Sequence, residues 1–126
     1  MKDKLEPNMY VRTKWGYICK IININDFREP SMKYGVEASY LKDIMFIGDD
    51  DILKASHNII DILEEGDYVN GNKVIEIEKN YKFIDGTIRD ILWTDTKMQK
   101  AIWDETIKSI VTKEMFSSVE YRMETD

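Results

Sequence analysis

The chain has 126 residues and a net charge of −6, with 43% hydrophobic residues, 33% charged residues and a single cysteine. This composition excludes a disordered or low-complexity protein, and one cysteine excludes an intrachain disulfide framework. The sequence has no run of about 18 apolar residues and no apolar signal-peptide stretch, so it predicts one soluble, cytoplasmic domain over residues 1–126.

The first third of the chain predicts short β-strands. Residues 10–24 are dense in β-branched and aromatic side chains and are interrupted once, at Trp15 and Gly16, which indicates a hairpin. Pro30 marks a loop, since proline restricts its own backbone and that of the preceding residue. The expected strands cover residues 10–13, 17–24, 34–40 and 44–47.

The middle of the chain changes character. Apolar residues between positions 52 and 63 recur at a spacing nearer to the 3.6 of a helix than to the 2 of a strand. Ser56 or Asn58 can cap a short helical turn in this segment, and Gly66 ends it.

Two tight turns are predicted after Gly66. Asn70 and Gly71 both tolerate the positive φ that a type I′ hairpin turn requires, and a second turn is expected at Asp85-Gly86. Between these turns we expect strands over residues 74–77 and 81–84.

The C-terminal region mixes helix and strand. From Thr94 the spacing becomes helical, because Met98 and Ile102 fall one turn apart. The expected elements are a helix over residues 95–105, a strand over residues 107–111, a capped turn over residues 112–116 and a final strand over residues 119–123.

These elements predict a mainly β fold of the α+β class. We expect an SH3-like small β-barrel or a partly open antiparallel sheet with one or two short helices. Tyr10-Val11 and Tyr68-Val69 each open a predicted hairpin, 58 residues apart. The two dipeptides fit either an internal repeat or the two hairpins of one barrel.

The negative charge is concentrated between residues 43 and 67. This window holds eight carboxylates against Lys54 alone and accounts for the charge imbalance of the whole chain. It fits either a solvated face or a carboxylate surface that meets a basic groove on a partner protein. The candidate partner-binding carboxylates are Asp49, Asp50, Asp51, Asp61, Glu64, Glu65 and Asp67.

Two aromatic residues are candidate anchors for that partner. Trp15 stands in a predicted turn beside Gly16, where a large ring is difficult to bury, and Tyr68 adjoins the acidic window. Arg12 and Lys14 precede Trp15 closely, so this turn is also the best nucleic-acid-like patch of the chain. The net negative charge disfavours general binding to phosphate backbones.

The sequence contains no catalytic or metal-binding pattern. His57 is the only histidine available to activate a nucleophile, and Cys19 lies in a predicted strand, where a buried thiol is unreactive. The run Asp49-Asp50-Asp51 lacks the alternating spacing of a calcium loop, and no glycine-rich phosphate loop occurs. We therefore expect a protein that is not an enzyme and that needs neither metal nor cofactor.

Segments along most of the chain resemble one group of proteins. They are residues 10–13, 16–18, 56–61, 66–71 and 110–116. Together they are similar to short hypothetical proteins of phages and prophages of Firmicutes, a group that has no assigned activity. The resemblance implies a phage setting, in which small acidic proteins that disable host defence, such as anti-CRISPR proteins, are a known class.

The resulting hypothesis is a non-catalytic, phage-derived inhibitor that binds and occludes a host defence protein in the bacterial cytoplasm. The partner would present a basic groove, as a CRISPR effector nuclease does, and the acidic surface would mimic DNA. Three alternatives stay open: a small nucleic-acid-binding or regulatory module, a protein that sequesters or destroys a nucleotide signal, and a structural phage component.

Overall fold

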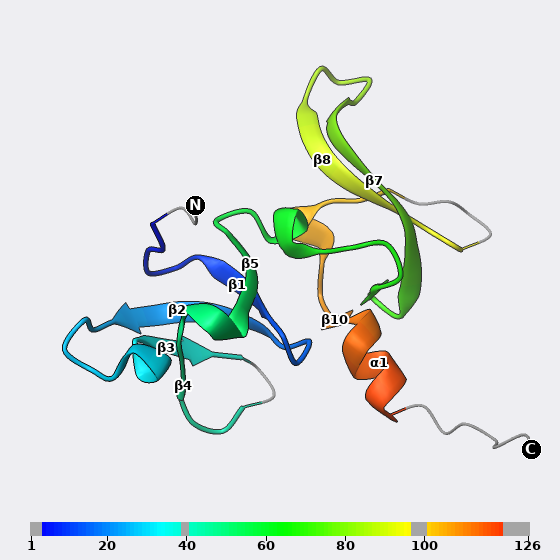
Figure 1. Ribbon diagram of the computed structural model, residues 1–126. Helices are drawn as coiled ribbons and strands as arrows, with labels where there is room; N and C mark the ends of the chain where they lie inside the picture. The colour runs from blue at the N-terminus through cyan, green and yellow to red at the C-terminus, as the bar shows by residue number, and fades with distance from the viewer. Residues whose placement is uncertain (1–3, 39–40, 97–100, 120–126) are drawn as a thin grey trace, which may run out of the picture.

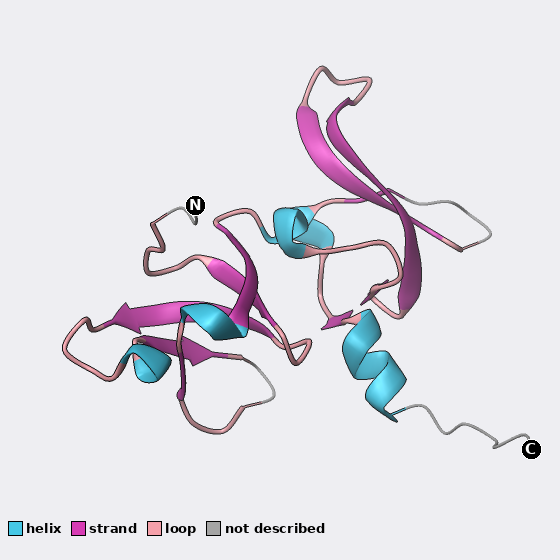
Figure 2. Ribbon diagram, viewed as in Figure 1, coloured by secondary structure: helices cyan, strands magenta, loops and turns pink. Residues whose placement is uncertain are grey.

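The computed structural model describes residues 4–38, 41–96 and 101–119, which form two antiparallel sheets followed by one helix (Figure 1). The first sheet comes from the N-terminal half of the chain and the second from the C-terminal half. Short 3-10 turns connect several of the strands (Figure 2).

The first sheet is a four-stranded meander with a fifth strand that returns to the first. Its strands are β1 (Tyr10–Thr13), β2 (Ile18–Ile24), β3 (Tyr34–Glu37), β4 (Met45–Ile47) and β5 (Ile52–Ser56). Their hydrogen-bonded order is β4-β3-β2-β1-β5. The 3-10 helix η1 (Pro30–Met32) precedes β3, and η2 (Asp49–Asp51) connects β4 to β5.

The second sheet follows the 3-10 helix η3 (Ile59–Ile62). Its strands are β6 (Tyr68–Val69), β7 (Asn72–Lys82), β8 (Ile88–Thr94), β9 (Ala101–Ile102) and β10 (Ile110–Val111), in the order β10-β6-β7-β8-β9. The 3-10 helix η4 (Asp104–Thr106) precedes β10, and the helix α1 (Lys113–Val119) follows it.

The two sheets share one topology. In each, a 3-10 turn that begins with acidic residues precedes a last strand, which pairs with the first strand of the same sheet. Tyr10-Val11 opens β1 and Tyr68-Val69 forms β6, so the matching dipeptides occupy equivalent first strands. Their spacing of 58 residues is therefore the spacing of two five-stranded units, and the two dipeptides do not lie in hairpins of one barrel.

Each sheet has its own hydrophobic core. Val11, Ile21 and Val36 are fully buried in the first, which also contains Met9, Cys19, Tyr34, Ile47 and Ile52. The second core consists of Ile60, Leu63, Val69, Val74, Leu92 and Ile102. Since η3 and residue 63 supply two of these side chains, the connection between the sheets is packed against the second one.

The turns predicted from sequence are confirmed. Asn70 and Gly71 have φ angles of 52° and 82°, as a type I′ turn demands, and Gly86 has a φ of 90°. The side chain of Asn58 accepts a hydrogen bond from the backbone N–H of Ile60 and so caps η3.

Two predictions of helical structure are wrong. Residues 52–56 share the helical spacing of their segment but form β5, because they pair with the open edge of β1. Within the helix predicted over residues 95–105, Ala101 and Ile102 form β9 and pair with β8, which was itself not predicted. Tertiary pairing overrides local spacing in both cases; residues 97–100 lie outside the described ranges.

The end of the chain also differs from the prediction. The helix α1 covers the place of the capped turn and continues to Val119, where a final strand was expected to begin. The rest of that predicted strand lies outside the described residues.

The predicted mainly β class is confirmed in its partly open form. Across the described residues, neither antiparallel sheet closes into a barrel. The same residues contain no helix with the length and apolar character needed to span a bilayer.

Candidate functional site

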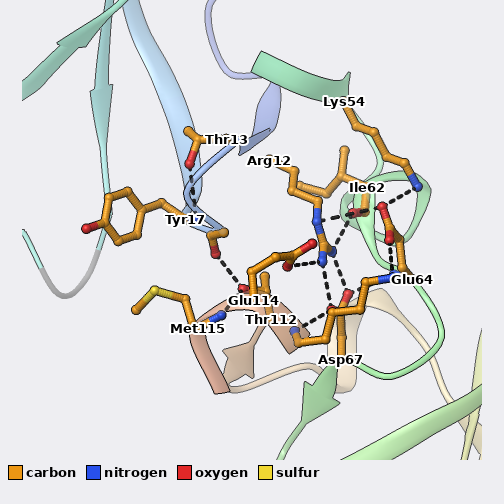
Figure 3. Close-up of polar contacts among 12 residues, drawn as sticks. Arg12, Thr13, Tyr17, Lys54, Ile62, Glu64, Asp67, Thr112, Glu114 and Met115 are labelled. Atoms are coloured by element: carbon orange, nitrogen blue, oxygen red, sulfur yellow. Dashed lines mark hydrogen bonds and ion pairs between the residues drawn. The ribbon is translucent and has the colours of Figure 1, made fainter. Parts of the chain in front are cut away.

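A buried ion pair joins the two halves of the chain. Arg12 of β1 donates from Nη1 to Asp67 Oδ2 at 2.6 Å and from Nη2 to Asp67 Oδ1 at 2.9 Å (Figure 3). Both side chains are fully buried. Because Asp67 immediately precedes β6, this bidentate pair links the first strands of the two sheets.

Backbone groups complete the surroundings of the pair. Arg12 Nη1 also donates to the carbonyl of Ile62 at 3.2 Å, while Asp67 accepts from the N–H groups of Glu64 and Lys113 at 2.7 and 2.9 Å. Burial by itself would lower the pKa of Arg12, but its hydrogen bonds with the carboxylates raise it. Arg12 is therefore an interior cation and cannot serve as the nucleic-acid contact that one alternative requires.

Charged side chains hold α1 against this pair. Glu114 of α1 accepts from Arg12 Nη2 at 2.6 Å, and Lys113 Nζ lies 2.6 Å from Glu64 Oε1. Lys54 approaches the other oxygen of Glu64 at 3.0 Å. The hydrogen bond from Lys113, with help from Lys54 and Arg12, lowers the pKa of Glu64 from 4.5 to about 2.

The Trp15 turn lies beside η2. The backbone N–H of Lys14 donates to the carbonyl of Asp51 at 2.9 Å, and Lys14 Nζ lies 3.0 Å from Asp51 Oδ1. The same ammonium stands 5.0 Å from the centre of the Trp15 ring. Trp15 keeps 46% of its surface exposed, so an exposed aromatic ring lies beside the ammonium group that pairs with Asp51.

The three aspartates of η2 differ in their contacts. Asp49 accepts from the Tyr34 hydroxyl at 2.7 Å, and Asp51 accepts from the Gly48 N–H at 3.0 Å. The hydrogen bond from Gly48, together with Lys14, lowers the pKa of Asp51. Asp50 is exposed. All three carboxylates are therefore presented by one short 3-10 turn, which Lys14 joins to the Trp15 turn.

The Trp15 turn also packs against the start of α1. Thr112 Oγ1 donates to the carbonyl of Gly16 at 2.6 Å. A Cβ atom added at Gly16 would lie only 2.7 Å from Thr112 Oγ1. The ring of Phe116 in α1 also stacks on the ring of Tyr68, with centroids 4.5 Å apart. The helix is therefore packed against the turn that holds Trp15 and against the ring of Tyr68.

Most of the predicted contact residues gather around η2 and α1. The Trp15 ring lies next to Lys14, which pairs with Asp51 of η2, and Tyr68 is in contact with α1, as is Glu64 through Lys113. We call the exposed part formed by Trp15 and the aspartates of η2 the η2 face.

Three of the predicted carboxylates are placed differently. Asp61 pairs with Lys79 and accepts from the Ser56 hydroxyl at 2.7 Å, at a distance from η2 along β5. Glu65 is exposed. Asp67 has no exposed surface, so it stabilises the fold and offers nothing to a partner.

Sequence reasoning missed α1 as part of this surface. Its signal was present, because Thr112 accepts from the N–H of Met115 at 3.3 Å in the way of a helix-capping residue. The segment was interpreted as an isolated turn before a strand. As a result, the exposed ring of Phe116 was not recognised as a neighbour of Tyr68.

The residues with catalytic potential are dispersed. His57 Nε2 lies 3.0 Å from Glu6 Oε2 on the surface, and Cys19 is buried in the first core. In the part of the chain that the structure describes, no three His, Cys, Asp or Glu side chains are arranged to hold a metal ion.

Comparisons of the chain with protein-family models, with curated proteins and with solved structures find no match. The chain is a mainly β protein with two partly open sheets of the same topology. A function for this chain therefore has to be inferred from its own surfaces.

Proposed function

We propose that the protein is a non-catalytic binding protein that occludes a basic groove on a partner protein. The resemblance to phage and prophage proteins suggests its setting: an anti-CRISPR-like inhibitor of a host defence protein in the bacterial cytoplasm. The observation that carries the proposal is the exposed Trp15 ring on the turn that Lys14 joins to η2, the 3-10 helix that carries Asp49, Asp50 and Asp51.

The two kinds of side chain suit a basic groove in different ways. A tryptophan contributes a large apolar contact area of the kind that dominates binding energy at interface centres. Carboxylates accelerate the encounter with a positive surface and add salt-dependent specificity. Because Lys14 fixes the turn to η2 through two contacts with Asp51, little ordering is needed when the partner binds.

The charge that a partner can meet is smaller than the sequence suggests. Asp67 is buried, and Glu64 is shared between Lys54 and Lys113. The proposed contact therefore centres on the η2 face, with Tyr68 and Phe116 as a second, apolar contact. This arrangement favours a small contact that blocks part of a basic groove over an extended acidic surface that mimics a DNA strand.

Affinity capture from lysates of bacteria that carry CRISPR systems tests the proposal. The tagged protein is washed at low and at high salt, and the retained proteins are identified by mass spectrometry and then purified for titration. We expect a nuclease or its effector complex at low salt and its loss at high salt, since the attraction is screened over about 10 Å at 0.1 M salt.

Two triple variants sharpen this test. Asp49→Asn, Asp50→Asn and Asp51→Asn together remove three charges but keep acceptor oxygens, and we expect about tenfold weaker binding with a flatter salt dependence. The control neutralises three exposed carboxylates elsewhere, with Glu37→Gln, Asp43→Asn and Glu76→Gln. Equal losses in both variants would exclude the η2 face as the contact.

A further inference from the structure

A pocket of about 460 Å³ lies on the outer face of the first sheet. Tyr10, Lys20 and Glu37 are direct cross-strand neighbours in β1, β2 and β3, so their side chains share one face of the sheet. The core residues Val11 and Ile21 point to the opposite face, because successive strand residues alternate. Since the three paired residues all line the pocket, one of its walls is the face of the sheet that the core does not use.

Two further segments complete the pocket. Ile59 of η3 lines it and also packs against the second hydrophobic core, so the pocket lies at the junction of the two sheets. Residues 41–44, which precede β4, form another wall. Ligand sites are frequent at such junctions, and the volume lies in the range of about 300–1,000 Å³ that accommodates one small molecule. We call this site the junction pocket.

The junction pocket offers two ammonium groups to a ligand. Lys20 Nζ stands 5.9 Å from the centre of the Tyr10 ring, and Lys42 is exposed at the edge of the pocket. Within the described part of the chain, the lysines that form ion pairs are Lys14, Lys33, Lys54, Lys79 and Lys113. Lys20 is therefore a half-buried cation without a carboxylate partner among these residues, and an anionic group on a ligand would supply one.

The rest of the lining suits an aromatic ligand with hydrogen-bond donors. Ile44 and Ile59 provide apolar surface, and Tyr10 provides an aromatic ring beside the Lys20 ammonium group. Glu37 and Asp43 add exposed carboxylates, which accept hydrogen bonds from the amino groups of a base or from the hydroxyl groups of a ribose. A purine mononucleotide combines an aromatic base, such donors and a phosphate in one molecule.

A second cavity of the chain lacks this combination. It measures about 360 Å³ and lies between η3, β8 and η4. Its described lining includes Asp90, Asp104 and Glu105, and its cation, Arg89, is already paired with Glu105 at 3.5 Å. A phosphate would meet three carboxylates in that cavity, so the junction pocket is the better site for an anion.

We infer that the junction pocket binds a purine mononucleotide. The phosphate contacts Lys20 and Lys42, and the base packs against Tyr10 and the isoleucine side chains. A net charge of −6 disfavours a nucleic-acid strand, but a single phosphate needs only local cations. The pocket shares no lining residue with the η2 face, so the inference does not depend on the function proposed above.

Isothermal titration calorimetry with the intact chain tests this inference. The ligands are guanosine monophosphate and adenosine monophosphate, and the comparison ligands are the two nucleosides and inorganic phosphate. We expect saturable binding of one of the monophosphates, with at least about tenfold weaker binding of its nucleoside, because the nucleoside lacks the charged group. Inorganic phosphate should bind at least about tenfold more weakly as well, because it lacks the base.

Three variants localise the binding. Lys20→Gln is expected to weaken binding of the monophosphate about tenfold and to reduce its salt dependence. Ile44→Asp should weaken it to a similar degree, because it replaces apolar surface with a charge that repels phosphate, and the exposed position of Ile44 spares the core. Lys82→Gln is the matched control, because Lys82 is an exposed lysine of β7 outside the pocket and its loss should leave the affinity unchanged.

Several results would overturn the inference. One is the absence of binding at millimolar monophosphate, and another is equal affinity for the monophosphate and its nucleoside, which would leave the ammonium groups without a role. Unchanged affinity in Lys20→Gln or in Ile44→Asp would contradict it as well. So would a loss in Lys82→Gln as large as that in Lys20→Gln.

Discussion

Arg12 and Asp67 are 55 residues apart in the chain and form a bidentate ion pair with no exposed surface on either side chain. Each stands in or next to the first strand of its sheet. An uncompensated charge inside a protein is strongly destabilising. Removal of either side chain therefore leaves a buried charge without its bidentate partner in or next to the other sheet. The pair therefore couples the stability of the two sheets.

Replacing one partner should show this coupling. We expect Arg12→Met and Asp67→Asn each to lower the free energy of unfolding by about 3–5 kcal/mol, and the double variant to lose less than the sum of the two. Urea denaturation measures the free energy of unfolding of the single and double variants. Lys14→Met is the control, because it breaks a partly exposed pair with Asp51 and should cost at most about 1 kcal/mol. Single losses no larger than the control would contradict the coupling.

The burial of Arg12 and Asp67 could not be predicted from the sequence. Arg12 was assigned to a possible nucleic-acid contact and Asp67 to a partner contact, because isolated charged residues are usually exposed. Their burial follows from a pairing across 55 residues, which no local pattern contains. By contrast, a cap at Ser56 or Asn58 and the Asn70-Gly71 turn were predicted from sequence, and the structure shows Asn58 as the cap, since capping and positive φ depend on residue type at one place.

Strands were likewise predicted where the local sequence determines them and missed where pairing with a distant strand determines them. β1 and β2 were predicted because they form a hairpin with a short turn. β5 and β9 are strands only because the edges of β1 and β8 accept them, and their own residues favour other structures. In the candidate site, Trp15 was predicted from its turn, whereas the contribution of α1 depends on contacts with Gly16 and Tyr68.

Acid should destabilise the protein partly through Glu64. Its pKa is about 2 in the folded protein and ordinarily 4.5, so the unfolded chain binds the proton first as pH falls. The stabilisation is fully present above about pH 4.5 and is lost as pH drops towards 2. We expect Glu64→Gln to reduce the dependence of unfolding free energy on pH in this window. Glu65→Gln, at the exposed neighbouring carboxylate, should retain the full dependence, and an identical change in both would contradict the assignment.

Two glycines provide a matched test of the packing of α1. Gly16 and Gly71 both have positive φ, 89° and 82°, so alanine at either position costs about 1–2 kcal/mol of backbone strain. A Cβ at Gly71 meets nothing within 4 Å, whereas one at Gly16 lies 2.7 Å from Thr112 Oγ1 and 2.9 Å from Glu114 Cβ. We expect Gly16→Ala to cost about 1–3 kcal/mol more than Gly71→Ala in urea denaturation. Equal costs would show that α1 is not packed on the Trp15 turn.

A similar pair of asparagines tests how β10 is held in the second sheet. Asn70 and Asn80 both have positive φ, 52° and 57°, so the strain of an alanine should be alike at the two positions. Asn70 Oδ1 also accepts from the N–H groups of Lys108 and Ser109, at 2.7 and 3.1 Å. Its Nδ2 donates to a third backbone group, the carbonyl of residue 106, at 2.9 Å.

Asn70→Ala should therefore cost about 2–3 kcal/mol more than Asn80→Ala, since each lost hydrogen bond contributes about 1 kcal/mol. Urea denaturation gives the free energy of unfolding of each variant. Asn70→Gly separates the two contributions to the loss, because glycine relieves the backbone strain but still lacks the side chain that makes the hydrogen bonds. Hydrogen exchange should accelerate at Ile110 and Val111 in Asn70→Gly, because the segment before β10 is no longer fastened to the turn. Unchanged exchange at these residues would mean that pairing with β6 alone holds the last strand in place.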